Sequence, residues 1–262
     1  MGDSVFWHPP DCCGPYSCDI VAKLATRLAT TSKSRSTLRP AGHDSDARER
    51  ILATAYSLFS RHGIRAVGVD TIVADADVAK MTFYRHFPSK DDLVLEFLER
   101  RERLWTQDWL QLEVERRAST PANQLLAIFD VFGTWFKRPD FEGCSFINVL
   151  LETAEARHPV RQATVVHLAR IRQFLQGLAK AAGIANPDDF ARKWHILMKG
   201  SIVAAGEGDT RAAQRARDVG FLLLKSEGVS FSEAESSAPK RQSNGHHRPV
   251  SLRSKAEPSK KR

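Results

Sequence analysis

Helical periodicity from about residue 44 to residue 228 is the feature that most restricts what this chain can fold into. Across this stretch apolar residues return every three or four positions, and no run alternates apolar and polar residues as a half-buried strand does. Short runs rich in Gly, Pro and Asp, such as RPDFEG and GIANPDD, separate the periodic segments. The pattern therefore predicts an all-α protein without internal repeats.

Capping residues and apolar spacing together predict where the helices begin and end. A first helix follows three capping candidates and ends at Gly63, and Asp70 caps a short second helix. Ser89, with two acidic residues in the first turn after it, caps a long helix that ends near residue 120. The candidates before the first helix are Asp44, Ser45 and Asp46. Later helices are expected at 121–137, 143–157, 160–182, 188–206 and 210–226.

The two ends of the chain differ in composition from this helical centre. Residues 1–43 mix Pro, Cys, Ser and Thr with little period, and residues 229–262 are rich in Ser, Pro, Lys, Arg and His. Such segments cannot bury enough apolar surface to offset the entropy of ordering, so both ends are expected to be disordered. Between them we expect two helical units, 44–92 and 93–228.

Positive charge is concentrated in the C-terminal end. The formal net charge is +8, but residues 239–262 hold eight Lys or Arg and one Glu, which is +7, so the rest of the chain carries only 8 − 7 = +1. Residues 44–92 hold seven Lys or Arg and eight Asp or Glu. The tail could add phosphate contacts that weaken with salt, or be an inert solubilising end. Because residues 44–92 are nearly neutral, their net charge gives no argument that they bind DNA.

Cysteine usage and hydropathy favour a cytoplasmic protein without a cofactor. The cysteines at 12, 13, 18 and 144 give neither a disulfide framework nor paired zinc spacing. Cys12, Cys13 and Cys18 could hold a metal together with His8, or could belong to an unstructured leader, and we expect no metal. No run approaches the ~18 apolar residues of a membrane span, and no basic segment followed by an apolar run opens the chain.

The stretch VAKMTFYRHF, residues 78–87, mixes aromatic rings with cations. Phe83 and Phe87 stand four positions apart and share one helical face, which can pack against the first helix. The other face is then offered outward, and it holds Lys80, Met81, Tyr84 and Arg85. A short helix that follows a tight turn and presents such groups has the layout of a helix-turn-helix recognition helix in a major groove.

The run RERILATAYSLFSRHGIRAVGVDTIVADADVAKMTFYRHFPSKDDL resembles the DNA-binding unit of the TetR/AcrR family of bacterial transcriptional regulators. The later segment FEGCSFINVLLE, residues 141–152, is similar to part of that family's ligand-binding and dimerisation domain. The resemblance implies a three-helix reader at 44–92 and a helical regulatory domain at 93–228. It also implies a homodimer that binds a palindromic operator as a repressor and releases it when a small effector binds.

The resemblance assigns DNA contacts residue by residue. Lys80 and Thr82 are expected at base edges or phosphates, and Tyr84 and His86 at phosphates. The full expected set is Thr71, Lys80, Met81, Thr82, Tyr84, Arg85, His86 and Lys90. Three positions depart from the family pattern: Asp77 stands where Gly is usual, Ala79 where Ser or Thr caps the helix, and Met81 where a small residue is common. These departures put operator affinity in doubt rather than the fold.

The regulatory half offers two sets of candidates on family grounds. Its aromatic content suggests an apolar or aromatic effector, with Glu152 or His167 as the polar group. The pocket candidates are Trp105, Trp109, Phe129, Phe132, Trp135, Cys144, Phe146, Glu152, His167 and Phe174. The candidates for the dimer interface are Trp194, Leu197, Met198, Ile202, Ala205, Ala216, Val219, Leu222 and Leu223. Each pocket candidate could equally be an ordinary core aromatic, and the stripe of dimer candidates could instead be core.

Two other functions remain open from the sequence. An all-α enzyme could use Cys144, His167 and Glu152, although no nucleophile elbow, P-loop, GxGxxG or HExxH accompanies them. A helical oligomerisation protein whose DNA reader has degenerated is the second alternative, because Asp77 and Ala79 depart from the family pattern.

Overall fold

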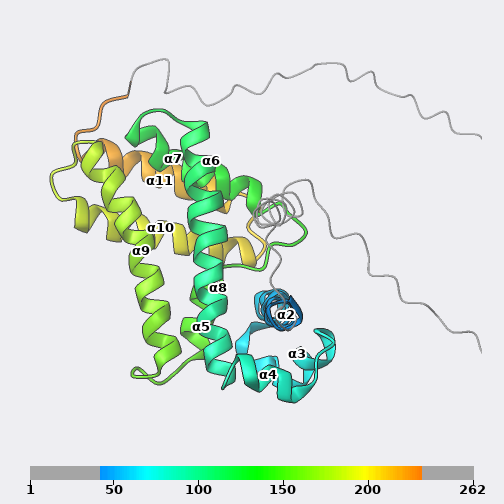
Figure 1. Cartoon of the computed structure of the whole chain (residues 1–262). Helices are drawn as coiled ribbons and strands as arrows, with labels where there is room; N and C mark the ends of the chain where they lie inside the picture. The colour runs from blue at the N-terminus through cyan, green and yellow to red at the C-terminus, as the bar shows by residue number, and fades with distance from the viewer. Residues whose placement is uncertain (1–41, 232–262) are drawn as a thin grey trace, which may run out of the picture. The chain divides into compact units, whose positions relative to one another are not determined.

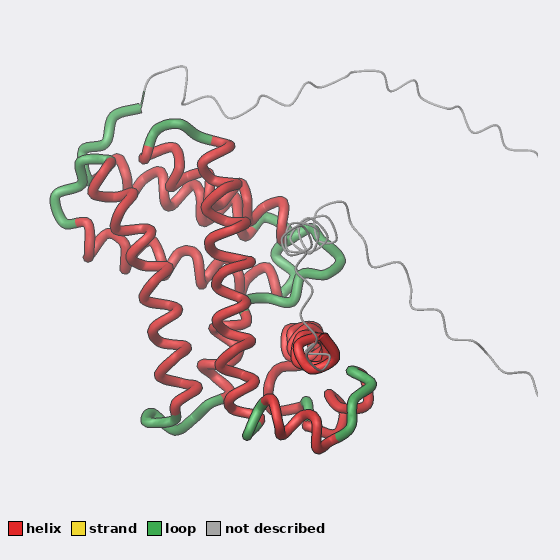
Figure 2. The backbone as a smooth tube through the Cα atoms, in the orientation of Figure 1, coloured by secondary structure: helices red, strands yellow, loops and turns green. Residues whose placement is uncertain are grey.

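The computed structural model describes residues 42–231, and this part of the chain is built from helices joined by short loops (Figures 1 and 2). It contains no strand, which confirms the predicted all-α class. The contacts discussed below lie in the compact unit that begins at Ala47. The helices are α2 (Gly42–Ala66), α3 (Val69–Asp75), α4 (Lys80–His86), α5 (Lys90–Arg101), the π-helix η1 (Glu102–Gln111), α6 (Leu112–Arg117), α7 (Pro121–Trp135), α8 (Ser145–Glu152), α9 (Pro159–Ala181), α10 (Pro187–Gly206) and α11 (Ala212–Ser226).

The helices α2, α3 and α4 pack around a small apolar core. Gly63 interrupts α2 with φ 77° and ψ 167°, a conformation that only glycine adopts easily. The chain can therefore turn at the end of α2 toward α3. The fully buried core side chains of this region include Ile51, Phe59, Ile72, Phe83 and Phe87.

The helices α5, η1 and α6 follow one another as one rod, drawn in cyan to green in Figure 1. The residues at both junctions, Arg101 and Leu112, keep right-handed helical backbone angles. The backbone is therefore continuous where the α-helical hydrogen bonds change to π-helical ones and back. The helix α9 packs along α5, while α10 packs on α9 and α11, and α11 on α7. The regulatory half is thus a layered bundle around buried Leu, Phe and Trp side chains.

Three expected boundaries differ from the structure. The helix α2 begins at Gly42, so Asp44–Asp46 lie in its first turns instead of capping it. Gly68 is the N-cap of α3, and Asp70 lies in its first turn. The helix α8 is shorter than the expected 143–157, because Cys144 and Thr153 at its ends have extended backbone angles. The expected cap at Ser89 is confirmed.

Some expectations fall on residues outside the described part of the chain. These are the expected disorder of residues 1–41 and 232–262, the alternatives for Cys12, Cys13, Cys18 and His8, and the role of the basic C-terminal end. No helix within residues 42–231 is both long and apolar enough to cross a membrane.

Candidate nucleic-acid interface

The turn between α3 and α4 depends on Asp77. Its φ of 50° makes it the one non-glycine residue with a left-handed backbone among the described residues. Aspartate tolerates this region better than most residues, so it can replace the glycine that the family pattern places here. Arg50 of α2 donates from Nη1 to the Asp77 carbonyl oxygen at 3.2 Å. Because that bond ties the turn to α2, the position of α4 is fixed relative to the first helix.

The inner face of α4 is made of rings. Phe83 and Phe87 are buried, and their ring centroids lie 6.0 Å apart. The guanidinium of Arg48 stands 5.1 Å from the centroid of the Phe87 ring, a distance at which a cation is attracted to the ring face. Ala79 caps α4 without a side-chain hydrogen bond. Burial of the rings, instead of a cap, therefore holds this seven-residue helix in place.

The outer face of α4 carries the polar and flexible groups. Met81 is the most exposed large apolar side chain of the described chain, at 80%, and Tyr84 lies beside it with its ring edge-on to Phe83. Of the eight expected DNA-contacting residues, five are exposed and three are partly buried. The exposed ones are Thr71, Lys80, Met81, Tyr84 and Arg85; the partly buried ones are Thr82, His86 and Lys90.

An ion pair joins α3 to α4 on this outer surface. Lys80 Nζ lies 2.7 Å from Asp70 Oδ1. The hydrogen bond to Asp70, supported by its charge, raises the pKa of Lys80 above its usual value. Lys80 is thus ionised and held at the edge of the recognition surface, and it must leave Asp70 to contact a phosphate fully. Reasoning from the sequence missed this pairing, although the ten-residue spacing across the turn was visible.

The start of α5 has a complete capping box. The Ser89 side chain accepts the backbone N–H of Asp92 at 3.2 Å, and the Asp92 carboxylate accepts the backbone N–H of Ser89 at 2.9 Å. Lys90 is the first residue of this helix, and burial lowers its pKa from the usual value. The Lys90 ammonium group thus lies beside the free backbone N–H groups at the start of α5, and both attract an anion.

Glu152, expected as the polar group of a pocket, instead joins α8 to the end of α2. Its Oε2 accepts the backbone N–H of Arg65 at 2.7 Å. The same carboxylate lies so close to Gly63 that a Cβ at that position would be 2.4 Å from Oε1. The regulatory helix α8 therefore touches the kink that leads into the reader. In the sequence, the glycine at position 63 was the signal that another group, here the Glu152 carboxylate, could approach the backbone closely.

Most of the expected pocket residues form packed core. The rings of Trp105 and Trp135 lie 5.2 Å apart, Phe132 packs against both, and Phe129 packs on Trp194. Cys144 is buried, and burial raises the pKa of its thiol, which opposes formation of a reactive thiolate. Phe146 stacks on His167 at 5.4 Å. Phe174 is the member of the set that lines an open hollow of about 560 Å³ between η1 and α9.

The expected dimer residues divide between core and surface. Trp194, Met198, Ile202 and Ala216 are buried within the chain and offer no surface to a second copy. Leu197, Ala205 and Leu223 are partly buried. Val219 and Leu222 are exposed, and so are Ile196 and Val203, which the sequence reading left out. Helical spacing identified apolar helices here, but these helices are apolar on two sides, so the spacing did not separate the inner face from the outer.

Comparison with known proteins matches both halves of the chain. Residues 51–97 match the family described as bacterial regulatory proteins, tetR family, and residues 121–219 match the tetracyclin repressor-like C-terminal domain. The transcriptional regulator EthR of Mycobacterium tuberculosis H37Rv is 36% identical over 208 residues, which cover 76% of this chain and 93% of EthR.

Two further relatives match a shorter and a longer part of the chain. The transcriptional activator FasR of Mycolicibacterium smegmatis is 36% identical over 81 residues, 28% of this chain and 37% of FasR. The solved structure of SCO4454, a TetR-family regulator of Streptomyces coelicolor, is 28% identical, with a TM-score of 0.63 over 71% of this chain and 97% of SCO4454. The chain belongs to the TetR family, whose members are transcriptional regulators and not enzymes.

Proposed function

We propose that this regulator binds a palindromic operator as a homodimer, represses transcription from it, and releases it when a small effector binds. The observation that carries the proposal is the two-sided α4, with Phe83 and Phe87 buried and Lys80, Met81 and Tyr84 exposed. A helix braced on one side can enter a major groove with the other side. Because a DNA-binding regulator must reach the chromosome, we infer that it acts in the cytoplasm.

The DNA contacts divide into positioning and reading groups. Tyr84 and Lys90 suit phosphates, because a phenol hydroxyl and a cation at a helix start both bind anionic oxygens. Lys80, Met81 and Thr82 occupy the first turn of α4, the part of a recognition helix that meets base edges. Thr71 in the first turns of α3 and His86 at the end of α4 flank this surface, where we expect further phosphate contacts. Arg85 is exposed beside them.

The dimer is proposed to form through the outer sides of α10 and α11. Ile196 and Val203 are seven residues apart, two turns of α10, and Val219 and Leu222 are three apart on α11, so each helix shows an exposed apolar stripe. An unpartnered stripe of this kind marks an interaction surface. Leu222→Glu is expected to give a monomer in sedimentation and to abolish palindrome binding, whereas Leu112→Glu, an equally exposed position on α6, is expected to leave the dimer intact.

A titration against DNA from upstream of the protein's own gene tests the reader. Tyr84→Phe removes one hydrogen bond of about 1 kcal/mol, so specific affinity is expected to fall about fivefold. Lys90→Ala is expected to weaken binding and to reduce the slope of log affinity against log salt by about 1. Lys180→Ala, an exposed lysine at the far end of α9, is the matched control. Equal affinities for specific and random DNA in all four proteins would instead favour a degenerate reader.

A further inference from the structure

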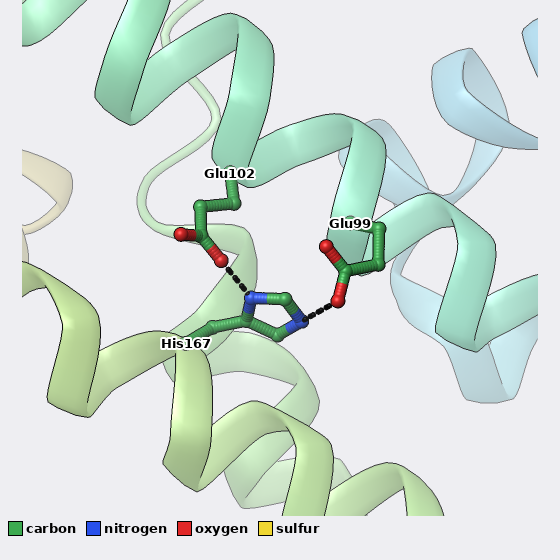
Figure 3. Close-up of side chains that lie close together, drawn as sticks. All are labelled: Glu99, Glu102 and His167. Carbon is green, nitrogen blue, oxygen red and sulfur yellow. Dashed lines mark hydrogen bonds and ion pairs between the residues drawn. The ribbon is translucent and has the colours of Figure 1, made fainter.

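Three ionisable side chains that the DNA-binding function does not use meet between α5, η1 and α9. Figure 3 shows the His167 ring lying between two carboxylates, with Nδ1 toward Glu102 and Nε2 toward Glu99. Glu102 and His167 are only 3% and 2% exposed, whereas the side chain of Glu99 is 63% exposed. Their ligand atoms all lie within 4.8 Å of one another. A buried imidazole and two carboxylates are groups that proteins use to bind metal ions.

The two nitrogens of the His167 ring make different contacts. Nδ1 is in direct hydrogen-bond contact with the Glu102 carboxylate, which fixes the orientation of the ring. Nε2 lies 3.9 Å from Glu99 Oε1, too far for a hydrogen bond. An ion about 2.1 Å from a histidine nitrogen and a carboxylate oxygen separates them by about 3.4 Å at a tetrahedral angle and by about 4.2 Å in line. The observed 3.9 Å lies between these values, and the exposed Glu99 side chain can move closer to the ring.

The charges around the ring leave room for a cation. Arg170 Nη1 lies 2.7 Å from Glu102 Oε2 and 3.6 Å from Glu99 Oε2. Two carboxylates, those of Glu99 and Glu102, therefore face the ring, and Arg170 supplies a guanidinium beside them. The Arg170 side chain is 44% exposed, so it can also swing away from Glu99.

A hollow next to this cluster shares Glu102 and Arg170 with it. Glu102 and Arg170 line the hollow of about 560 Å³ together with Thr106, which is 2% exposed and whose Oγ1 has no hydrogen-bond partner. A buried hydroxyl without a partner costs about 1–3 kcal/mol, which a water or ligand in the hollow would offset. The hollow lies along η1, and π-helical turns are frequent at functional sites.

We propose that His167 Nε2 and the Glu99 carboxylate bind a divalent transition-metal ion of the zinc type, with Glu102 orienting the imidazole through Nδ1. An imidazole nitrogen favours Zn²⁺ and its neighbours over Mg²⁺ or Ca²⁺, which prefer oxygen ligands alone. A carboxylate behind a ligating histidine is the usual second partner of such a ring. Glu99 is exposed to solvent, so water can fill the remaining coordination positions.

The ion would join the rod α5–η1 to α9. The helix α5 begins at Ser89 and Lys90, directly after the recognition helix, so a clamp on its other end can change how the reader is held. This consequence for DNA binding rests on the proposed function, whereas binding of the ion does not. We expect one bound metal to alter operator affinity in the wild type and not in Glu99→Gln.

Metal titration of the full chain tests the proposal independently of DNA. Cys12, Cys13 and Cys18 are changed to serine in every protein tested, because thiolates bind the same metals. Zn²⁺ binding is measured by calorimetry, and Co²⁺ binding by its visible d–d absorption bands. His167→Gln and Glu99→Gln are each expected to lower the affinity of one site at least tenfold, and Glu102→Gln by about tenfold. Glu99 is exposed, so its variant keeps the fold, which circular dichroism checks.

Two controls separate a site from surface chelation and from a plain ion-pair network. His158→Gln, at a half-buried histidine 3.4 Å from Asp91, is expected to leave the affinity unchanged. Arg170→Gln removes the competing cation and is expected to raise the affinity several-fold, while a purely structural network would gain no metal binding from it. The proposal is overturned if wild type and His167→Gln bind Zn²⁺ equally, or if neither binds it.

Discussion

The reader and the regulatory half place their polar groups in opposite ways. In α2 to α4 the phenylalanine rings are inside and most hydrogen-bonding groups are outside. Ser60 is the one buried polar residue that the described part of these helices contains. From η1 onward the structure buries several polar groups, among them Glu102, Thr106, His167 and His195. Burying such groups destabilises a protein unless they find partners. The first region thus keeps its polar groups at the surface, whereas the second must satisfy several of them inside its core.

The largest effect is expected from breaking the inner face of α4. Phe83→Ala removes a fully buried ring from a helix that has no side-chain cap, so the free energy of unfolding should fall by about 3–5 kcal/mol. Denaturant unfolding measures it, and DNA binding should be lost with it. Met81→Ala on the outer face should lower the free energy of unfolding by less than about 0.5 kcal/mol. Equal losses in the two variants would contradict the assignment of inner and outer faces.

The buried polar groups of the second region should make it sensitive to acid. Burial, with the nearby charges of Lys199 and Arg172, lowers the pKa of His195 from 6.5 to about 3. The unfolded chain binds this proton near pH 6.5 and the folded chain does not, so the stability from His195 is present above pH 6.5 and lost as the pH falls toward 3. The loss is about 1 kcal/mol per pH unit.

Unfolding measured from pH 7 to pH 4.5 tests this sensitivity. His195→Gln, which cannot take up a proton, should flatten the pH dependence over this range. His62→Gln, at an exposed position of α2, is the control and should keep the slope of the wild type. An unchanged slope in His195→Gln would show that other groups produce the acid sensitivity.

A smaller effect is expected where the two regions touch. Gly63→Ala forces a left-handed alanine and places a Cβ against the Glu152 carboxylate, at a cost of about 1–2 kcal/mol from the backbone plus the clash. In a Glu152→Ala background the clash disappears and only the backbone cost remains. A double-mutant cycle should therefore show coupling of about 1 kcal/mol. Strict additivity would mean that α8 and the kink are independent.

Sequence reasoning succeeded where one residue type decides the local structure. Ser89 and Asp92 form a capping box without help from distant residues. Asp77 is the turn residue because few other residues tolerate a left-handed backbone. The four-residue spacing of Phe83 and Phe87 indicates the inner face of α4. These features involve neighbours within a few positions. The turn, the inner face of α4 and the cap of α5 were therefore predictable from the sequence, whereas the caps of α2 and α3 were not.

Features that depend on distant partners were not predictable in the same way. His167 meets Glu102 across 65 positions, and Glu152 meets Arg65 across 87. Apolar spacing predicted a helix through η1 but did not distinguish its π-helical hydrogen bonds from those of an α-helix. On α10 and α11, apolar residues lie on both sides, so the buried Trp194 was grouped with the exposed Leu222 as a candidate for the dimer interface. The apolar spacing predicted these helices but not which side of each helix faces the core.

Selection of genomic fragments bound by the wild-type protein, followed by sequencing, tests the central claim most directly. A dimer with two α4 readers should enrich fragments that share one palindrome, with half-sites spaced by about one helical turn of DNA or a multiple of it. A combined Lys80→Ala and Tyr84→Ala variant should lose this enrichment. Fragments without a common palindrome, or equal enrichment by that variant, would contradict the account of α4 as the reader of DNA.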